Sequence, residues 1–238
     1  MLHTFWITFL YTPLNNMLAF ILHIVPYGDV GIAIILLTIL VKIALFPLSR
    51  RSIISQLKLK KLEPEINKMK MDFPDKTEQA KKTFEIYKRE GVNPFSGCLL
   101  IGLQLPIIIA LFTVFRSGIH FSPEAMYSFV KIPTIVSMKF LGLIDLNTKN
   151  IFLAVIVGIS QYIIARITAS APIVPKTDGQ SSFQEEFAKS MQMQMKYVLP
   201  IFIAFFAYIG MGIVALYFVT SNIMTIFQEL YIRKRISN

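Results

Sequence analysis

One positively charged side chain lies inside an otherwise apolar stretch of the sequence. The stretch from Gly31 to Ser49 is about long enough to cross a bilayer, and it contains Lys42. A charged group in hydrocarbon is costly and usually faces a protein interior or a wet cavity. Lys42 lies five residues before Pro47, or roughly 8 Å at ~1.5 Å per residue. Its stem could therefore snorkel to the headgroups, or its ammonium could occupy a cavity that water enters.

Other polar side chains interrupt the apolar stretches of the chain. Thr38 is one helical turn before Lys42 and shares its face. Ser and Thr hydroxyls can bond their own helix backbone, and Gln can bridge two helices, so each residue also has a purely structural explanation. Because the interpretation finds no carboxylate in another span to pair with Lys42, it favours a hydrophilic cavity open to the nearer surface. The further polar side chains within the expected spans are Gln104, Ser160, Gln161, Tyr217, Thr220 and Ser221.

Patterns for catalysis do not accompany these residues. The sequence has no P-loop, and His3, His23 and His120 share no metal-ligand spacing. No apolar stretch carries a Ser/His or paired Asp arrangement suited to proteolysis. We therefore expect a protein that is not an enzyme and uses no cofactor and no metal.

The composition indicates an integral membrane protein. Of the 238 residues, 54% are hydrophobic, whereas soluble domains have roughly 45–50%. Long apolar runs recur along the chain, which is typical of membrane spans. The net charge of +10 could suggest a nucleic-acid binder, but the charges cluster between the apolar runs, and basic loops are typical of the cytoplasmic side of a membrane protein. We expect no DNA as a partner.

The order of apolar and polar segments predicts an all-α membrane protein with five spans. Pro13 and an Asn pair interrupt the first apolar segment, which is therefore expected to lie in the outer interface as an amphipathic helix rather than to span. The outer loop is expected to be partly helical. The expected segments are an interfacial helix at 1–27, span one at 28–49, a cytoplasmic helical hairpin at 50–93, span two at 94–116, an outer loop at 117–149, span three at 150–167, a cytoplasmic loop at 168–196, span four at 197–210, span five at 211–230 and a cytoplasmic tail at 231–238.

The distribution of basic residues predicts the orientation. The segments assigned to the inside carry nineteen Lys and Arg, and those assigned to the outside carry four. The positive-inside rule then places the N-terminus outside and the C-terminus in the cytoplasm. This requires an odd number of spans, which five satisfies.

The polar segment 50–93 predicts two helical arms around a turn at Pro74. It carries twelve Lys and Arg against seven Asp and Glu. Such a hairpin could touch lipid headgroups, ribosomal RNA or a receptor, although a solvated charged surface would look the same.

Four segments together resemble the YidC/Oxa1/Alb3 family of membrane protein insertases. "NPFSGCLLIGLQLPIIIALF" resembles the family's Asn-Pro, Gly-Cys and Gln-x-Pro segment, and "ILVKIALFPLS" is similar to its first core span. "MQMQMKYVLPIF" and "GIVALYFVTSNIMTIFQELYIRK" resemble its fourth and fifth spans. The resemblance covers nearly the whole chain in the right order.

The resemblance implies a bacterial inner-membrane insertase with five helices around a hydrophilic groove open to the cytoplasm. The groove residues that it implies are Lys42, Thr38, Gln104, Ser160, Gln161 and Tyr217. Its implied partners are nascent membrane proteins and the bilayer, with the Sec translocon and the ribosome as further candidates, and a monomer suffices. Polar segments enter the groove and apolar segments slide into the lipid, without nucleotide hydrolysis. The implied slide residues are Leu105, Ile108, Phe112, Phe202, Phe205 and Phe218, and the implied recruitment residues on the hairpin are Arg50, Arg51, Lys58, Lys81 and Lys82.

The sequence departs from the family at position 42, where Lys replaces the usual Arg. Lys lacks the planar fork that holds a carboxylate at two points. Two other functions stay open at this stage. A polar cavity could serve a transporter or channel subunit, although the expected inverted repeats and span carboxylates are not evident, and the chain could be a structural partner in a translocation complex.

Overall fold

The protein is helical over most of its length. The computed structural model describes residues 6–237 apart from 74, 94–95, 117–120, 122–125, 169–189 and 191–192. Most of the expected cytoplasmic loop 168–196 lies outside the described residues. The elements are η1 Ile7–Tyr11, α2 Thr12–Ile24, η2 Pro26–Gly28, α3 Val30–Ala44, α4 Phe46–Asp72, α5 Lys76–Arg89, α6 Ser96–Arg116, β1 Lys139–Phe140, β2 Ile144–Asp145, α7 Ile151–Thr168, η4 Gln194–Val198, α9 Leu199–Ile209 and α10 Met211–Ser237.

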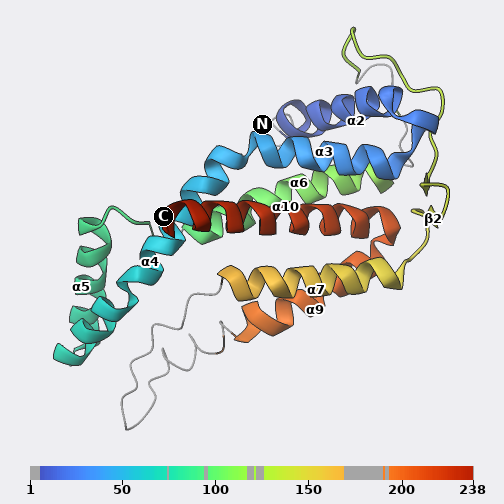
Figure 1. Ribbon diagram of the computed structural model, residues 1–238. Helices are drawn as coiled ribbons and strands as arrows, with labels where there is room; N and C mark the ends of the chain where they lie inside the picture. The colour runs from blue at the N-terminus through green and yellow to red at the C-terminus, as the bar shows by residue number, and fades with distance from the viewer. Residues whose placement is uncertain are drawn as a thin grey trace.

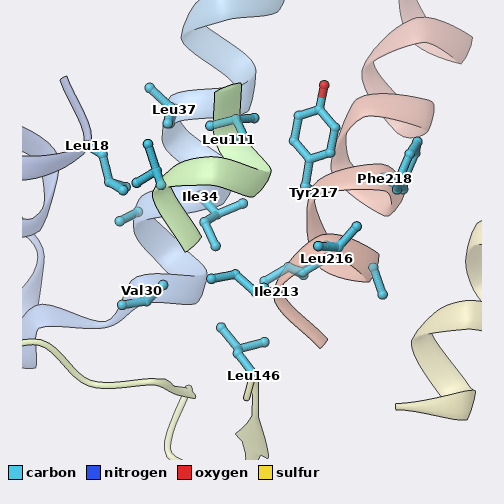
Figure 2. Packing of buried hydrophobic residues seen from close by; sticks show 14 of the residues in the cluster. Leu18, Val30, Ile34, Leu37, Leu111, Leu146, Ile213, Leu216, Tyr217 and Phe218 are labelled. Atoms are coloured by element: carbon cyan, nitrogen blue, oxygen red, sulfur yellow. The ribbon is translucent and has the colours of Figure 1, made fainter. Parts of the chain in front are cut away.

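The long helices form one bundle around α10. Figure 1 shows α3 and α6 on one side of α10, with α2 along α3, and α7 and α9 on the other side. The helices α4 and α5 project from the end of the bundle where α10 finishes, and the two short strands lie at the opposite end. Leu18, Ile34, Leu37, Leu146 and Ile213 are fully buried where these elements meet, and Figure 2 shows them converging.

The first expected span, 28–49, consists of α3 and the first turn of α4. The helix α3 ends at Ala44, and α4 begins at Phe46 with its axis turned by 62°. Pro47 stands in the first turn of α4, where a missing N–H does no harm, and it cannot continue the hydrogen bonds of a preceding helix. The break therefore falls next to Lys42, in the last turn of α3.

The later boundaries follow the expected segments closely, with one extension. The helix α7 covers the third expected span, 150–167, and α9 with the π-helical turn η4 covers the fourth, 197–210. The chain reverses at Gly210 and Met211, where Met211 has a φ of 68°. The helix α10 then continues to Ser237, so the described part of the expected tail, 231–237, extends the fifth helix.

The described part of the expected outer loop, 117–149, contains no helix. Its regular structure is the strand pair β1 and β2. Residues 117–120 and 122–125 of the loop lie outside the described residues, so the expectation of partial helix stays a prediction. Asp29 fixes this segment to the bundle, because one carboxylate oxygen caps α3 by accepting from the Ile32 N–H at 3.1 Å and the other accepts from the Leu141 N–H at 2.7 Å. At Gly31 a Cβ would lie 2.3 Å from the ring of Phe140, so only glycine allows this approach.

The same outer segment caps the start of α10. The first N–H groups of a helix have no partner within it. Here the Gly212 N–H donates to the Thr148 carbonyl at 2.8 Å and the Ile213 N–H to the Leu146 carbonyl at 3.1 Å. Figure 2 shows the Leu146 side chain beside Ile213 at this end of the core. The short strands thus position the helix at the centre of the bundle.

The number of membrane spans stays a prediction. Among the described residues, three helical stretches are long and apolar enough to cross a membrane, namely Ile7–Ile24, Ile151–Thr168 and Met211–Ile236, and the bent pair α3 and α4 makes a fourth. The first of these is the stretch expected to lie in the interface. Its Asn15 and Asn16 are buried, and the Oδ1 of Asn16 accepts from the Tyr127 N–H at 2.7 Å, so the Asn pair faces protein.

The helices α4 and α5 pack together around a small apolar cluster. Ile66 is fully buried against Ile86, Tyr87 and Val92. Asp75 caps α5 by accepting from the Thr77 N–H at 3.1 Å. Val92 follows the end of α5, so the cluster joins both helices and the turn that leads to α6.

A buried carboxyl group lies beside this cluster. Glu63 is 9% exposed, and neither its Oε1 nor the nearby Oδ1 of Asn67 has a hydrogen-bond partner among the described residues. Burial raises the pKa of Glu63 above its ordinary value of 4.5, and the positive charge of Lys60 opposes this rise. Burial, and then the charge of Glu63, raise the pKa of Tyr87. A charged Glu63 therefore weakens the packing of α4 on α5.

We expect the substitution Glu63→Gln to slow hydrogen exchange of the α5 amides at pH 7 by roughly fivefold. The neutral amide removes a buried charge and supplies a donor for Asn67, and one unsatisfied buried group costs at least ~1 kcal/mol. A raised native pKa favours the native state below pH 4.5, and this contribution is lost as the pH rises through the raised pKa. The protection of the α5 amides in the wild type, corrected for the intrinsic exchange rate, should therefore decline as the pH rises from 4.5 through the raised pKa of Glu63. The same protection in the variant should not change with pH.

The matched control is Glu65→Gln, two residues away on α4. Its carboxylate pairs with Arg89 at 2.7 Å, but both side chains are about half exposed, so water and salt screen the pair. Its effect on α5 exchange should be small. Faster exchange in Glu63→Gln, or an equal gain in both variants, would contradict the prediction.

Candidate functional site

Residues from three helices line a cavity in the middle of the bundle. Lys42 and Thr38 come from α3, Gln104 from α6 and Tyr217 from α10. The sequence names all four as cavity residues, and the structure brings them together. The remaining lining is apolar, with Leu37, Val41, Leu45, Ile107 and Leu111.

The ammonium of Lys42 is held by α10. Its Nζ donates to the Thr225 Oγ1 at 3.0 Å, and the Thr225 hydroxyl donates in turn to the Ser221 carbonyl at 2.8 Å. Because the hydroxyl proton is used there, Thr225 acts toward Lys42 only as an acceptor. Gln228 fixes the same residue from its backbone, since its Nε2 donates to the Lys42 carbonyl at 3.0 Å. Two residues of α10 thus position the cation at the end of α3.

The helices α6 and α10 meet through a side-chain amide and a phenol. Gln104 of α6 donates to the hydroxyl of Tyr217 on α10. Thr38 instead donates to the Ile34 carbonyl of its own helix at 2.7 Å. Its hydroxyl thus bonds its own helix backbone, which is the purely structural role considered for Ser and Thr above. Tyr217 is buried, and Figure 2 shows its hydroxyl directed away from the apolar core around Ile213 and Leu216.

The cavity is narrow in this conformation. It encloses about 280 Å³ of space between atoms, part of which is open to the surroundings, and the centre of a water molecule fits in about 10 Å³ of it. This is close to the space that one water molecule needs. A peptide segment would not fit without a movement of the helices.

Ser160 and Gln161, the remaining two residues of the predicted set, do not line this cavity. Ser160 is buried between α7 and α10, where its hydroxyl donates to the Val157 carbonyl at 3.0 Å and accepts from the Asn222 Nδ2 at 2.9 Å. Ser160 thus has a purely structural role, as a polar contact between α7 and α10. Gln161 is half-buried on α7.

The sequence interpretation overlooked a carboxylate near the end of the fifth expected span. Glu229 is 2% exposed, and its Oε1 accepts from the Nη2 of Arg233 at 2.7 Å and from its Nε at 3.0 Å. Arg233 also donates to the Ile167 carbonyl at the end of α7, at 2.8 Å. Glu229 thus has its own cation, and it is not the partner of Lys42. The spacing of four residues between Glu229 and Arg233 is the signal that could have revealed this pair.

The residues expected to guide apolar segments differ in exposure. Leu105 on α6 and Phe202 and Phe205 on α9 are exposed. Ile108 and Phe112 are partly buried against the core. Phe218 is only 6% exposed and packs edge-on against Phe206 and Tyr217.

The five basic residues expected to recruit substrate lie on α4 and α5. Arg50, Arg51, Lys58 and Lys81 are exposed. Lys82 is partly exposed and pairs with Glu85 at 3.0 Å. Four of the five thus present their charge to the surroundings.

Comparison with known proteins finds relatives over almost the whole chain. The family model described as 60Kd inner membrane protein matches residues 21–238. A protein of Fusobacterium nucleatum named membrane protein insertase YidC is 33% identical over 236 residues, which cover 96% of this chain and 98% of that protein. Proteins of the same name from Blochmanniella floridana and Haemophilus influenzae are 29% and 30% identical. The chain covers 94% of its own length in both matches but spans only 36% of those longer proteins.

We expect Thr225→Val to lower the thermal stability of the protein in detergent. Valine has nearly the same shape but cannot accept from the ammonium of Lys42, and a hydrogen bond to a charged group contributes about 1.5–3 kcal/mol. Thr225→Ser keeps the acceptor and should melt close to the wild type. The measurement is the unfolding midpoint of each purified variant under one set of conditions.

A double-variant cycle separates this contact from a general packing defect. In the Lys42→Met background no ammonium remains to be accommodated, so adding Thr225→Val should cost little. An equal loss of stability in both backgrounds would mean that Thr225 does not act through Lys42.

Proposed function

The chain belongs to the 60Kd inner membrane protein family, and from this membership we propose that it inserts newly made proteins into the membrane. It is an all-α, multi-pass inner membrane protein. The names of the relatives support the insertase function. The observation that carries the mechanism is the cavity in which Lys42, Thr38, Gln104 and Tyr217 come together between three helices.

In the proposed mechanism, this cavity receives the polar flank of a nascent membrane protein. Carrying such a flank through hydrocarbon is the barrier to insertion, because its polar groups would lose their hydrogen bonds. A cavity with a cation and amide and hydroxyl groups shortens the apolar path. The ammonium of Lys42 attracts acidic flanks in particular. Its one described partner, Thr225, is neutral, so the positive charge remains available to a substrate.

Admission of a flank requires the cavity to widen. The Gln104–Tyr217 hydrogen bond is the polar contact that links α6 to α10 across it. We place the opening movement between these two helices. When they separate, Gln104 and Tyr217 lose their mutual hydrogen bond and bond to polar groups of the substrate instead. The described contacts from α10 to Lys42, by contrast, can stay intact during this movement.

The apolar part of a substrate would move along exposed apolar side chains. Leu105 on α6 and Phe202 and Phe205 on α9 support this role because they are exposed. The partly buried Ile108 and Phe112 belong to the same proposed path once α6 moves. Phe218 would contribute through its ring contacts, which hold the side chains of Tyr217 and Phe206 in place. Transfer of about 20 apolar residues into lipid is downhill, so this step needs no nucleotide.

The hairpin of α4 and α5 is the proposed site of substrate recruitment. We place it in the cytoplasm with the C-terminus, and the N-terminus outside, because most of the basic residues lie in these segments. The exposed Arg50, Arg51, Lys58 and Lys81 would attract acidic segments before they reach the cavity, and Lys82 would do so in exchange for Glu85.

We expect Lys42→Met to reduce the insertion of substrates with acidic flanks by roughly tenfold. Two unit charges 4 Å apart attract by about 1 kcal/mol in water and about 4 kcal/mol near a protein surface, and a wet cavity lies between these limits. Lys42→Arg keeps the charge and should insert the same substrates nearly as well as the wild type. The measurement is protease protection of single-span substrates in liposomes that contain each purified variant.

Matched substrates with the acidic residues changed to their amides serve as the internal control. Their insertion should depend on the protein but differ little between wild type and Lys42→Met. If acidic substrates insert equally well into empty liposomes, the insertase function is wrong. If Lys42→Met inserts every substrate as the wild type does, the function stands but Lys42 has no part in it.

A further inference from the structure

Two tyrosines and two cations gather where α7 ends and α9 is about to begin. Tyr162 on α7 and Tyr197 in η4 have ring centroids 6.0 Å apart. The guanidinium carbon of Arg166 lies 6.0 Å from the centre of the Tyr162 ring, and the Nζ of Lys196 lies 5.1 Å from the centre of the Tyr197 ring. We call these four residues the tyrosine–cation cluster.

The cluster lies at the border between apolar and polar surface. Arg166 is in the last turn of α7, and η4 leads directly into the apolar helix α9. Tyrosine is enriched at the membrane–water interface, since its ring is apolar and its hydroxyl polar. Apolar side chains next to the cluster residues along the chain are exposed, and in a membrane they face acyl chains: Ile163, Met193, Met195 and Val198.

The two cations have no ion pair among the residues that the structure describes. The described ion pairs involve Lys82, Arg89 and Arg233. Arg233, on the neighbouring helix α10, is occupied by Glu229 and the Ile167 carbonyl. Contact with a ring face leaves the N–H donors of a cation free. Within the described part of the chain, Arg166 and Lys196 thus have no carboxylate partner, and each cation lies over a tyrosine ring.

We propose that the tyrosine–cation cluster binds the headgroup phosphate of an anionic phospholipid. A phosphate oxygen accepts strong hydrogen bonds from a guanidinium and an ammonium, and the phenol hydroxyls are further donors. The exposed apolar side chains beside the cluster favour a lipid over a soluble phosphate, because they provide a surface for its acyl chains. Basic residues between helices at this depth attract anionic lipids.

This site is separate from the cavity of Lys42. None of its four residues lines that cavity, so the proposal does not depend on the insertase mechanism. A bound lipid would join α7 to the start of α9, at the end of the bundle where Figure 1 shows α10 finishing. It would thus stabilise the pairing of α7 and α9.

The same two helices provide a matched control at their other end. There the Nζ of Lys149 lies 5.7 Å from the centre of the Tyr208 ring. This is a cation just before α7 that lies over a tyrosine of α9, but it is one cation and one ring rather than two of each. Lys149→Gln therefore removes a similar contact without touching the proposed site.

The test measures lipid retained by the full-length protein in detergent, by native mass spectrometry, with phosphatidylglycerol and phosphatidylcholine of identical acyl chains. We expect the wild type to retain phosphatidylglycerol at least tenfold more tightly than phosphatidylcholine. The double variant Arg166→Gln, Lys196→Gln should lose this preference, and Lys149→Gln should keep it. Equal retention of the two lipids by the wild type, an unchanged preference in the double variant, or an equal loss in Lys149→Gln would overturn the proposal.

A second measurement covers the case in which the double variant does not fold. The charge-preserving exchange Arg166→Lys, Lys196→Arg should still bind phosphatidylglycerol, and added phosphatidylglycerol should raise the unfolding midpoint of the wild type more than phosphatidylcholine does, because a ligand of the native state stabilises it. No difference between the two lipids in that midpoint would also overturn the proposal. Insertion assays would be unaffected by this outcome, so failure of the lipid site and failure of the insertase function are distinguishable.

Discussion

Polar groups inside apolar helices need partners within the protein, and in this chain one helix supplies most of them. Lipid is as apolar as leucine, so apolar side chains alone give membrane helices little reason to associate. The helix α10 contacts three of its neighbours, α3, α6 and α7, through polar groups. Thr225 and Gln228 hold α3 at Lys42, Tyr217 holds α6 and Asn222 holds α7 at Ser160. These contacts fix how the helices are rotated relative to α10, and so they decide which side chains face the cavity.

The two ends of α10 obey the same requirement. At its start the N–H groups that lack a partner within the helix donate to carbonyls of the outer segment. Near its end Arg233 donates to the Ile167 carbonyl of α7 and pairs with Glu229. A buried pair of this kind is not a source of great stability by itself, because both groups lose their hydration. Its value here is positional, since it fixes the end of α7 against α10.

Much of this arrangement could be predicted from the sequence, and the rest has clear physical reasons. Apolar length indicated the helices, and the four-residue spacing placed Thr38 and Lys42 on one face. The grouping of Gln104 and Tyr217 with them came from the family resemblance. Ser160 and Gln161, which the resemblance also placed there, do not line the cavity described here, and the sequence could not show this, because a helix that is apolar on all sides gives no periodic signal of its rotation. Thr225 and Gln228 were missed since their roles depend on a tertiary contact.

The break between α3 and α4 couples two distant parts of the molecule. The helix α4 has 27 residues and is therefore about 40 Å long, with its near end four residues after Lys42 along the chain. A rotation of α4 relative to α3 would take place at Leu45, the residue between the two helices. Turning α4 by about 5° moves its far tip by roughly 3.5 Å over that length, while Leu45 itself barely shifts. Ser52 of α4 also donates to the Ser96 carbonyl at 2.6 Å, and α4 packs on α6 and α10, so a load on the tip would reach these two helices as well as the bend beside Lys42.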